Sequence, residues 1–193
     1  MSALHPRLAG PPPAALADAF AREGHVRVDD ALAPGLAAEL ALVLRGLPLG
    51  PERAPGSVAW AGALGVPAGL DPQNPPCIHA AIRLLDQDLP AFVGALVGQP
   101  VARPDPGRLP LWFFRKGGYA DDEGPLVPGG IDVLIGLTGG HWPAAWGGHL
   151  ALSDRTLPPG FATLDLLRDR RFAVPLLTHH VEALWLRTCL VPT

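Results

Sequence analysis

The sequence Ile131-Asp-Val-Leu-Ile-Gly-Leu-Thr-Gly-Gly-His-Trp-Pro-Ala-Ala-Trp-Gly-Gly-His-Leu-Ala-Leu-Ser-Asp154 contains the pattern that decides the fold. It begins with an apolar run at 131–137, rich in the aliphatic residues that favour strands. A second short run at 149–152 follows a pair of glycines, Gly147 and Gly148. Paired glycines allow two backbones to approach closely. The stretch therefore predicts a strand, a tight crossover and a second strand.

Short apolar runs bounded by Gly and Pro recur through the second half of the chain, which is typical of many short strands with tight connections. We expect strands at 109–115, 131–137, 149–152, 161–167, 172–177 and 183–191. Helical spacing of apolar residues precedes them at 14–22, 34–46, 78–85 and 89–97. The first half also contains a predicted strand at 25–29, an irregular connection over 47–76 and, within that connection, a candidate strand at 57–61.

This order of elements predicts a mainly β protein with helices (α+β). The expected fold is a double-stranded β-helix, the jelly-roll or cupin-like architecture, with its strands drawn mainly from 109–191. The helices, including those over 78–97, would pack on one outer face. We expect one domain over all 193 residues.

Composition and charge argue against several classes of function. The 15 basic and 18 acidic residues give a net charge of -3 without a basic cluster, so nucleic acid is not an expected partner. No stretch approaches the roughly 20 apolar residues of a membrane helix, and the N-terminus lacks a leader pattern. Cys77 and Cys189 have no partner motif, which predicts free thiols in a reducing cytoplasm. Nucleophile turns, phosphate loops and dinucleotide fingerprints are also missing.

The stretch 131–154 closely resembles a block common in prolyl-hydroxylase-like iron(II)/2-oxoglutarate oxygenases. Trp142 and the sequence Gly147-Gly-His-Leu150 match the family's Trp followed by Gly-Gly-His-Leu-x-Leu. The first helix, the sequence Gly24-His-Val-Arg-Val-Asp-Asp30 and the Leu-Ala-Pro-Gly-Leu-Ala at 32–37 are similar to the family's entry into its fold. The resemblance leaves 47–107 unmatched and implies a jelly-roll barrel.

Members of this family hold Fe(II) with two His and one carboxylate, which leaves positions for 2-oxoglutarate and oxygen. The first His and the carboxylate come as His-x-Asp, and aligning the carboxylate with Asp122 places Ala120 where the His would be. Phe172 takes the place of the second His, and Arg187 matches a late-strand Arg that pairs with 2-oxoglutarate. The resemblance thus implies a degenerate iron site. We expect Ala120 and Phe172 to face inward, with Asp122 nearby and Arg187 deeper in.

Each candidate residue also has an ordinary structural interpretation. Asp122 lies in the acidic run 121–123, which is typical of a surface turn. Arg187 would bind a carboxylate of a cofactor or substrate, or another anion if it is buried. His179 and His180 are adjacent, so at most one can point into the barrel, and both are typical of a solvated turn.

Three functional hypotheses follow. The first is an oxygenase-fold protein that has lost standard iron binding and needs no cofactor: a pseudoenzyme, a metal-free catalyst or a partner subunit in a bacterial biosynthetic pathway. The second is an active oxygenase using Fe(II) and 2-oxoglutarate, with Asp122 and His179 or His180 as shifted ligands. The third is a structural subunit of a biosynthetic complex. The expected ligand is a small molecule, a peptide or a partner protein.

Overall fold

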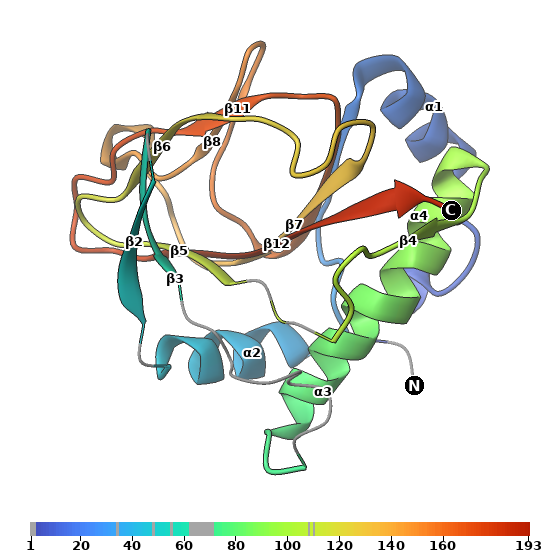
Figure 1. Ribbon diagram of the computed structural model, residues 1–193, viewed down its shortest axis with the longest axis horizontal. Helices are drawn as coiled ribbons and strands as arrows, with labels where there is room; N and C mark the ends of the chain where they lie inside the picture. Colours follow the sequence, from blue (N-terminus) through green and yellow to red (C-terminus); the bar gives the residue numbers. More distant parts are fainter. Residues whose placement is uncertain are drawn as a thin grey trace.

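The structure is a computed structural model that describes residues 3–33, 35–47, 49–54, 56–61, 72–107, 109 and 111–193 (Figure 1). Its α-helices are α1 (Ala14–Glu23), α2 (Leu36–Arg45), α3 (Pro76–Arg83) and α4 (Leu89–Val97). Short helical segments lie at η1 (Pro6–Leu8), η3 (Leu84–Asp88) and η4 (Ala144–Trp146). No helix within the described ranges has the length and hydrophobicity to cross a lipid bilayer.

The helices agree with the predictions and end for identifiable reasons. α1 follows three prolines and ends at Gly24, which adopts a left-handed conformation with φ of 66°. The prediction over 34–46 is confirmed by α2, although Pro34 lies outside the described residues. The two helices predicted within 78–97 form one continuous rod, because the π-helical η3 joins α3 to α4. Pro90 is tolerated there in the first turn of α4.

The strands form a single antiparallel network that folds around into a barrel (Figure 1). They are β1 (His25–Val28), β2 (Gly50–Ala54), β3 (Ser57–Ala61), β4 (Val101–Ala102), β5 (Leu111–Phe114), β6 (Tyr119–Glu123), β7 (Ile131–Leu137), β8 (Leu150–Leu152), β9 (Thr156–Leu157), β10 (Phe161–Arg168), β11 (Phe172–Val174) and β12 (Ala183–Pro192).

One wall of the barrel has the strand order β1-β10-β7-β12-β5, and the other has the order β6-β11-β8-β9. β3 joins the two walls, because it pairs with β5 and with β6. This topology confirms the predicted double-stranded β-helix. β2 pairs with β3, and β4 pairs with the end of β12.

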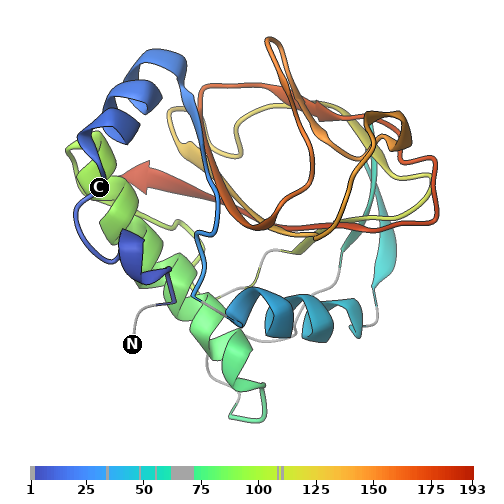
Figure 2. The ribbon, with the colours of Figure 1, turned by 180° about the vertical axis from the view of Figure 1, so that it is seen from behind.

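Strand alternation separates two apolar cores. On β12, Leu184 and Leu186 pack with the helices, whereas Trp185 between them points into the barrel. β7 alternates in the same way, with Ile135 on the helix side and Leu134 inside. Figure 2 shows the helices gathered around one side of the barrel. The outer core therefore lies between the helices and the β1–β5 wall.

The second core fills the inside of the barrel and is here called the inner cluster. Its buried members are Ala59, Phe114, Ala120, Leu134, Leu150, Leu152, Leu167, Phe172, Val174, Leu177, Ala183 and Trp185. These side chains are packed against one another as in other protein interiors. Any functional group in the barrel has to be placed against these side chains.

The crossover predicted from the glycine pairs is present between β7 and β8. At Gly147, where φ is 72°, a Cβ would collide with the backbone carbonyl of Leu176. The Trp142 indole N–H donates to the Gly147 carbonyl at 2.8 Å, and the Gly148 N–H donates to the Pro175 carbonyl at 2.8 Å. The glycines therefore allow the β7–β8 and β11–β12 connections to meet.

Five strands differ from the predictions, among them the short β9, which was not predicted. β2 occupies part of 47–76, where we expected an irregular connection, although the candidate strand at 57–61 is confirmed as β3. Residues 62–71 of that connection lie outside the described residues. β6 forms in a stretch that also had the pattern of an acidic turn, and β4 was not predicted. The strand expected over 172–177 ends at Val174, because the next residue is a proline without a backbone N–H.

Candidate functional site

The site is organised by an irregularity where β6 pairs with β11. Ala120 lies opposite Val174, and Glu123 lies opposite Phe172, so three steps along β6 match two steps along β11. β6 therefore contains a β-bulge with one extra residue. A bulge reverses the alternation of the strand beyond it. In this strand it turns the Asp122 side chain outward and brings Glu123 toward the barrel interior.

Asp122 is not beside the inward-facing residues, which corrects our expectation of a carboxylate near Ala120. Its side chain is 65% exposed and accepts a hydrogen bond from the Arg171 Nε at 2.6 Å. That hydrogen bond lowers the pKa of the Asp122 carboxyl. Simple alternation would have placed Asp122 on the same face as Ala120, but the bulge prevents it.

Ala120 and Phe172 both lie within the inner cluster, where the sequence led us to expect inward-facing side chains. They are 1% and 3% exposed, respectively. They are not direct cross-strand partners, however, since the residue opposite Phe172 is Glu123. A second ligand able to share a metal with position 172 would therefore come from position 123 rather than from position 120.

Arg187 lies inside the barrel and is bound by groups of this chain. Its Nη1 donates to Glu123 Oε2 at 2.6 Å, and its Nη2 donates to the Gly124 carbonyl at 2.9 Å and to Asp132 Oδ2 at 3.3 Å. The guanidinium carbon lies 5.0 Å from the centroids of two rings, Trp112 and Phe172. Carboxylates thus neutralise the cation, and aromatic rings contact it.

One N–H group of the Arg187 guanidinium lacks a hydrogen-bond partner among the described residues. This is the Nε group, which is buried. The side chain is only 7% exposed, so water has little access to this group. A buried donor without a partner is costly and marks a place where a ligand oxygen or an ordered water would be favourable.

Asp132 is the most deeply buried member of this group, with 1% of its side chain exposed. Burial raises the pKa of its carboxyl, while the Leu126 N–H and the Arg187 guanidinium act in the opposite direction. The sequence analysis missed Asp132 and Glu123 as partners of Arg187. An Asp inside the apolar run 131–137 was a usable signal, because buried carboxylates need a partner. Glu123 could not be identified without knowing of the bulge in β6, which turns its side chain toward Arg187.

His179 and His180 lie at the other end of β6 and do not approach Asp122. The His179 ring stacks on Trp146 with 5.2 Å between centroids, and both histidines are exposed. His180 Nε2 is 3.1 Å from the Lys116 Nζ, in the connection that precedes β6. Asp122 and the two histidines are therefore separated by the length of the strand. The arrangement does not bring the proposed shifted ligands together.

The residues that the resemblance aligns with the iron positions do not offer two His and one carboxylate. Ala120 and Phe172 offer no donor atom, and the Glu123 carboxylate is engaged by Arg187. Within the described ranges, no group of three or more His, Cys, Asp or Glu is placed to hold a metal ion.

A second charged group on the inner face ties β1 to β10. The Asp165 carboxylate is fully buried and accepts two hydrogen bonds from Arg27, from Nε and Nη2, both at 2.8 Å. His25 Nε2 lies 3.3 Å from the same carboxylate. Because the guanidinium engages both oxygens of Asp165, this group serves as a bidentate ion pair between strands rather than as a metal site.

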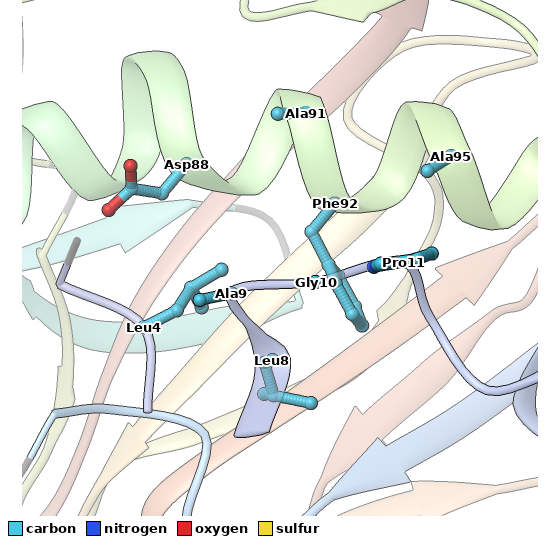
Figure 3. A pocket seen from close by; sticks show the side chains of 9 residues that line it. All are labelled: Leu4, Leu8, Ala9, Gly10, Pro11, Asp88, Ala91, Phe92 and Ala95. Carbon is cyan, nitrogen blue, oxygen red and sulfur yellow. The ribbon is translucent and has the colours of Figure 1, made fainter. Parts of the chain in front are cut away.

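A groove of about 330 Å³ lies outside the barrel, between the N-terminal segment and the rod of η3 and α4 (Figure 3). Figure 3 shows Leu4, Leu8 and Phe92 on its walls, with Asp88 at one end. The Asp88 carboxylate accepts the Ala3 backbone N–H at 2.7 Å. The acidic group therefore anchors the N-terminal segment to the rod, and the rest of the groove is apolar packing.

Comparison with known proteins identifies the fold. By sequence, no protein-family model and no curated protein matches the chain. By structure, it is similar to a prolyl-4-hydroxylase from Pseudomonas putida, with a TM-score of 0.71, 16% identity and coverage of 93% of this chain and 98% of that protein.

Two further solved structures show the same barrel. An oxidoreductase of the 2OG-Fe(II) oxygenase family from Burkholderia pseudomallei has a TM-score of 0.68 and 18% identity, over 92% of this chain and 90% of that one. HygX from Streptomyces hygroscopicus, solved with nickel and 2-oxoglutarate bound, has a TM-score of 0.66 and 12% identity, over 94% and 88%. The fold is thus that of the 2-oxoglutarate oxygenases.

Proposed function

We propose that this chain is an oxygenase-fold protein that lacks the standard iron centre and acts as a binding or partner protein in the manner of a pseudoenzyme. The observation that carries the proposal is the β6–β11 bulge, which places Glu123 opposite Phe172 and against Arg187. A phenyl ring and an already engaged carboxylate occupy the place where two metal ligands would have to face one another.

The surroundings of Arg187 support this proposal. In the family, the late-strand Arg is the partner of a 2-oxoglutarate carboxylate. Here Glu123 takes that role for Nη1, while Gly124 and Asp132 accept from Nη2. An entering dicarboxylate would have to displace Glu123 and place its own negative charge beside the buried Asp132. Like charges in a buried site repel strongly, so cosubstrate binding is disfavoured.

An active Fe(II)- and 2-oxoglutarate-dependent oxygenase is the second candidate, and two observations favour it. Similar folds include HygX with nickel and 2-oxoglutarate bound and SnoN, described as a non-heme alpha ketoglutarate dependent epimerase. In addition, the buried Arg187 Nε has no partner among the described residues, so it has a free donor for a ligand. Iron binding by Asp122 with His179 or His180 would require these groups to leave their present contacts.

A turnover assay separates the two candidates. Purified protein is incubated with Fe(II), ascorbate and 2-oxoglutarate, and succinate is measured. We expect no succinate above the rate of a protein-free control. Succinate formation that is lost in His180→Ala would replace our proposal with the active oxygenase.

Pairs of introduced histidines test the assignment of the positions. Glu123→His with Phe172→His places two imidazoles directly across from each other, where Cβ atoms lie about 4.5–5.5 Å apart. Ala120→His with Phe172→His places them diagonally, at about 7–8 Å. We expect the first pair to bind Ni(II) more tightly in a calorimetric titration. Equal affinity, or a preference for the second pair, would show that the register at the bulge is not as described.

A role as a structural subunit of a complex stays a prediction. Affinity purification of the tagged chain from its native cells, followed by mass spectrometry, tests it. Stoichiometric recovery of one partner supports that role.

A further inference from the structure

Three connections meet at the end of the barrel remote from Glu123 and Phe172. They are the β5–β6, β7–β8 and β11–β12 connections, which gather opposite the end where α1 and α4 lie (Figure 1). The Gly117 N–H donates to the Leu177 carbonyl at 2.7 Å, and the Thr178 N–H donates to the Trp146 carbonyl at 2.9 Å. Backbone hydrogen bonds therefore hold the three connections together as one surface.

This surface contains two adjoining hollows, here called the end cleft. One has a volume of about 510 Å³ and the other about 430 Å³, and both are lined by His180, Val181 and Glu182. Arg45 and Trp142 line the first hollow. Pockets of roughly 300–1,000 Å³ are the size that binds small molecules.

Positive charge dominates the end cleft. Arg45 from the end of α2 and Arg115 from the end of β5 approach the two oxygens of Glu182, at 3.4 Å and 3.3 Å. Lys116 points to the same place, with its Nζ 3.1 Å from His180 Nε2. The two hollows are thus lined by three basic side chains and one carboxylate, on a chain whose net charge is -3. Glu182 is the one carboxylate among the described residues that line the two hollows, so it does not balance the positive charge there.

Trp142 and Trp146 line the first hollow, whereas Arg115 and Lys116 line the second. Trp142 and Trp146 meet edge to face with 5.8 Å between centroids, and the indole N–H of Trp142 is fixed to the Gly147 carbonyl. The Trp146 ring also stacks with the His179 ring. Both tryptophans are partly exposed. They are therefore oriented in advance and keep surface available for contact with a flat ligand.

We propose that the end cleft is a binding site for a small aromatic anion, with the anionic group held by Arg115 and Lys116 and the ring packed against Trp142 and Trp146. The site does not depend on iron or 2-oxoglutarate, and it lies at the opposite end of the barrel from Arg187. Glu182 occupies the two arginines in the free protein and competes with the ligand for them.

The proposal makes opposite predictions for neighbouring residues. Loss of a charge-assisted hydrogen bond in Lys116→Ala should weaken binding of phenyl phosphate about tenfold or more. Glu182→Gln should strengthen it severalfold, because it removes the internal competitor. A site for a cation would respond to Glu182→Gln with loss of binding instead. Arg22→Ala is the matched control, since Arg22 is an exposed cation on α1 that contacts Glu23 and lines neither hollow.

The test is a titration with phenyl phosphate, inorganic phosphate and benzylamine, followed by the indole N–H signals of the five tryptophans in NMR spectra. Trp142→Phe and Trp146→Phe assign the relevant signals. We expect phenyl phosphate to shift these two signals and to bind more tightly than inorganic phosphate. Arg22→Ala should bind phenyl phosphate with the same affinity as the unaltered protein.

Other outcomes overturn the proposal. If inorganic phosphate bound with the same affinity, the ring would contribute nothing to binding. Tighter binding of benzylamine would show that the site prefers a cation to an anion. Absence of binding at millimolar phenyl phosphate, or shifts confined to other tryptophans, would show that the end cleft is not the site. Lys116 is exposed, so Lys116→Ala is expected to remain folded, and an unchanged urea midpoint checks this.

Discussion

Replacing Arg187 by methionine tests the charged group inside the barrel. Methionine keeps an unbranched chain of similar reach, but it leaves Asp132 buried with only the Leu126 N–H as a described donor. Removing one partner of a buried ion pair costs about 3–5 kcal/mol. Asp132 can lower this free-energy cost by taking up a proton. At neutral pH, protonating a carboxyl with an ordinary pKa near 3.9 costs at most about 4 kcal/mol. Because burial has already raised the pKa of Asp132, we expect a loss of about 3 kcal/mol.

The sign of the pH dependence follows from the same residue. A carboxyl whose folded-state pKa is raised holds its proton more tightly in the folded state, so its contribution to stability is best at low pH and falls as pH rises through the folded pKa. The deficit of Arg187→Met should therefore shrink between pH 7 and about pH 5. Urea unfolding monitored by circular dichroism measures both values. Arg187→Met combined with Asp132→Asn should lose less than Arg187→Met alone. A deficit below about 1 kcal/mol, or one independent of pH, would refute this description of the group.

Three further substitutions test other parts of the barrel. Phe172→Ala should lower the free energy of unfolding by about 3–4 kcal/mol, because it opens a cavity in the inner cluster; a smaller loss in urea unfolding would mean that this site is loosely packed. Gly147→Ala should cost at least about 3 kcal/mol, whereas Gly140→Ala, also at positive φ but with open space around it, should cost only about 1–2 kcal/mol; equal midpoints would exclude the backbone collision. Asp122→Asn should lower the melting temperature slightly at neutral pH. That difference should vanish in acid below the folded-state pKa, because the hydrogen bond from Arg171 lowers that pKa and its stabilisation is lost as pH falls; a difference that persists in acid contradicts the ion pair.

The fold was largely predictable because its strands carry strong local signals. The apolar run 131–137 and the glycines at 147–148 predicted β7, the crossover and β8, and the structure has all three. β2 was not predictable, because Gly50-Pro-Glu-Arg-Ala54 has neither alternation nor β-branched residues and forms a strand only by pairing with β3.

The site was less predictable, because one inserted residue changes which side chains face inward. Alternation counted from Ala120 predicts that Asp122 points into the barrel. The local sequence does not predict the bulge, which turns Glu123 inward in place of Asp122. Arg187 was singled out by the resemblance, because it matches the family's late-strand Arg, but its partners come from two other strands. Contacts between residues so distant in sequence depend on the register of the whole barrel.

The most direct test of the proposed loss of iron binding is an anaerobic titration of the purified protein with Fe(II), followed by 2-oxoglutarate, in a calorimeter. Because Ala120 and Phe172 offer no ligand and Glu123 is engaged by Arg187, we expect no saturable Fe(II) binding and no iron-dependent binding of 2-oxoglutarate. Stoichiometric binding of Fe(II) with micromolar or tighter affinity, enhanced by 2-oxoglutarate, would contradict the proposal and identify the chain as an iron-dependent oxygenase.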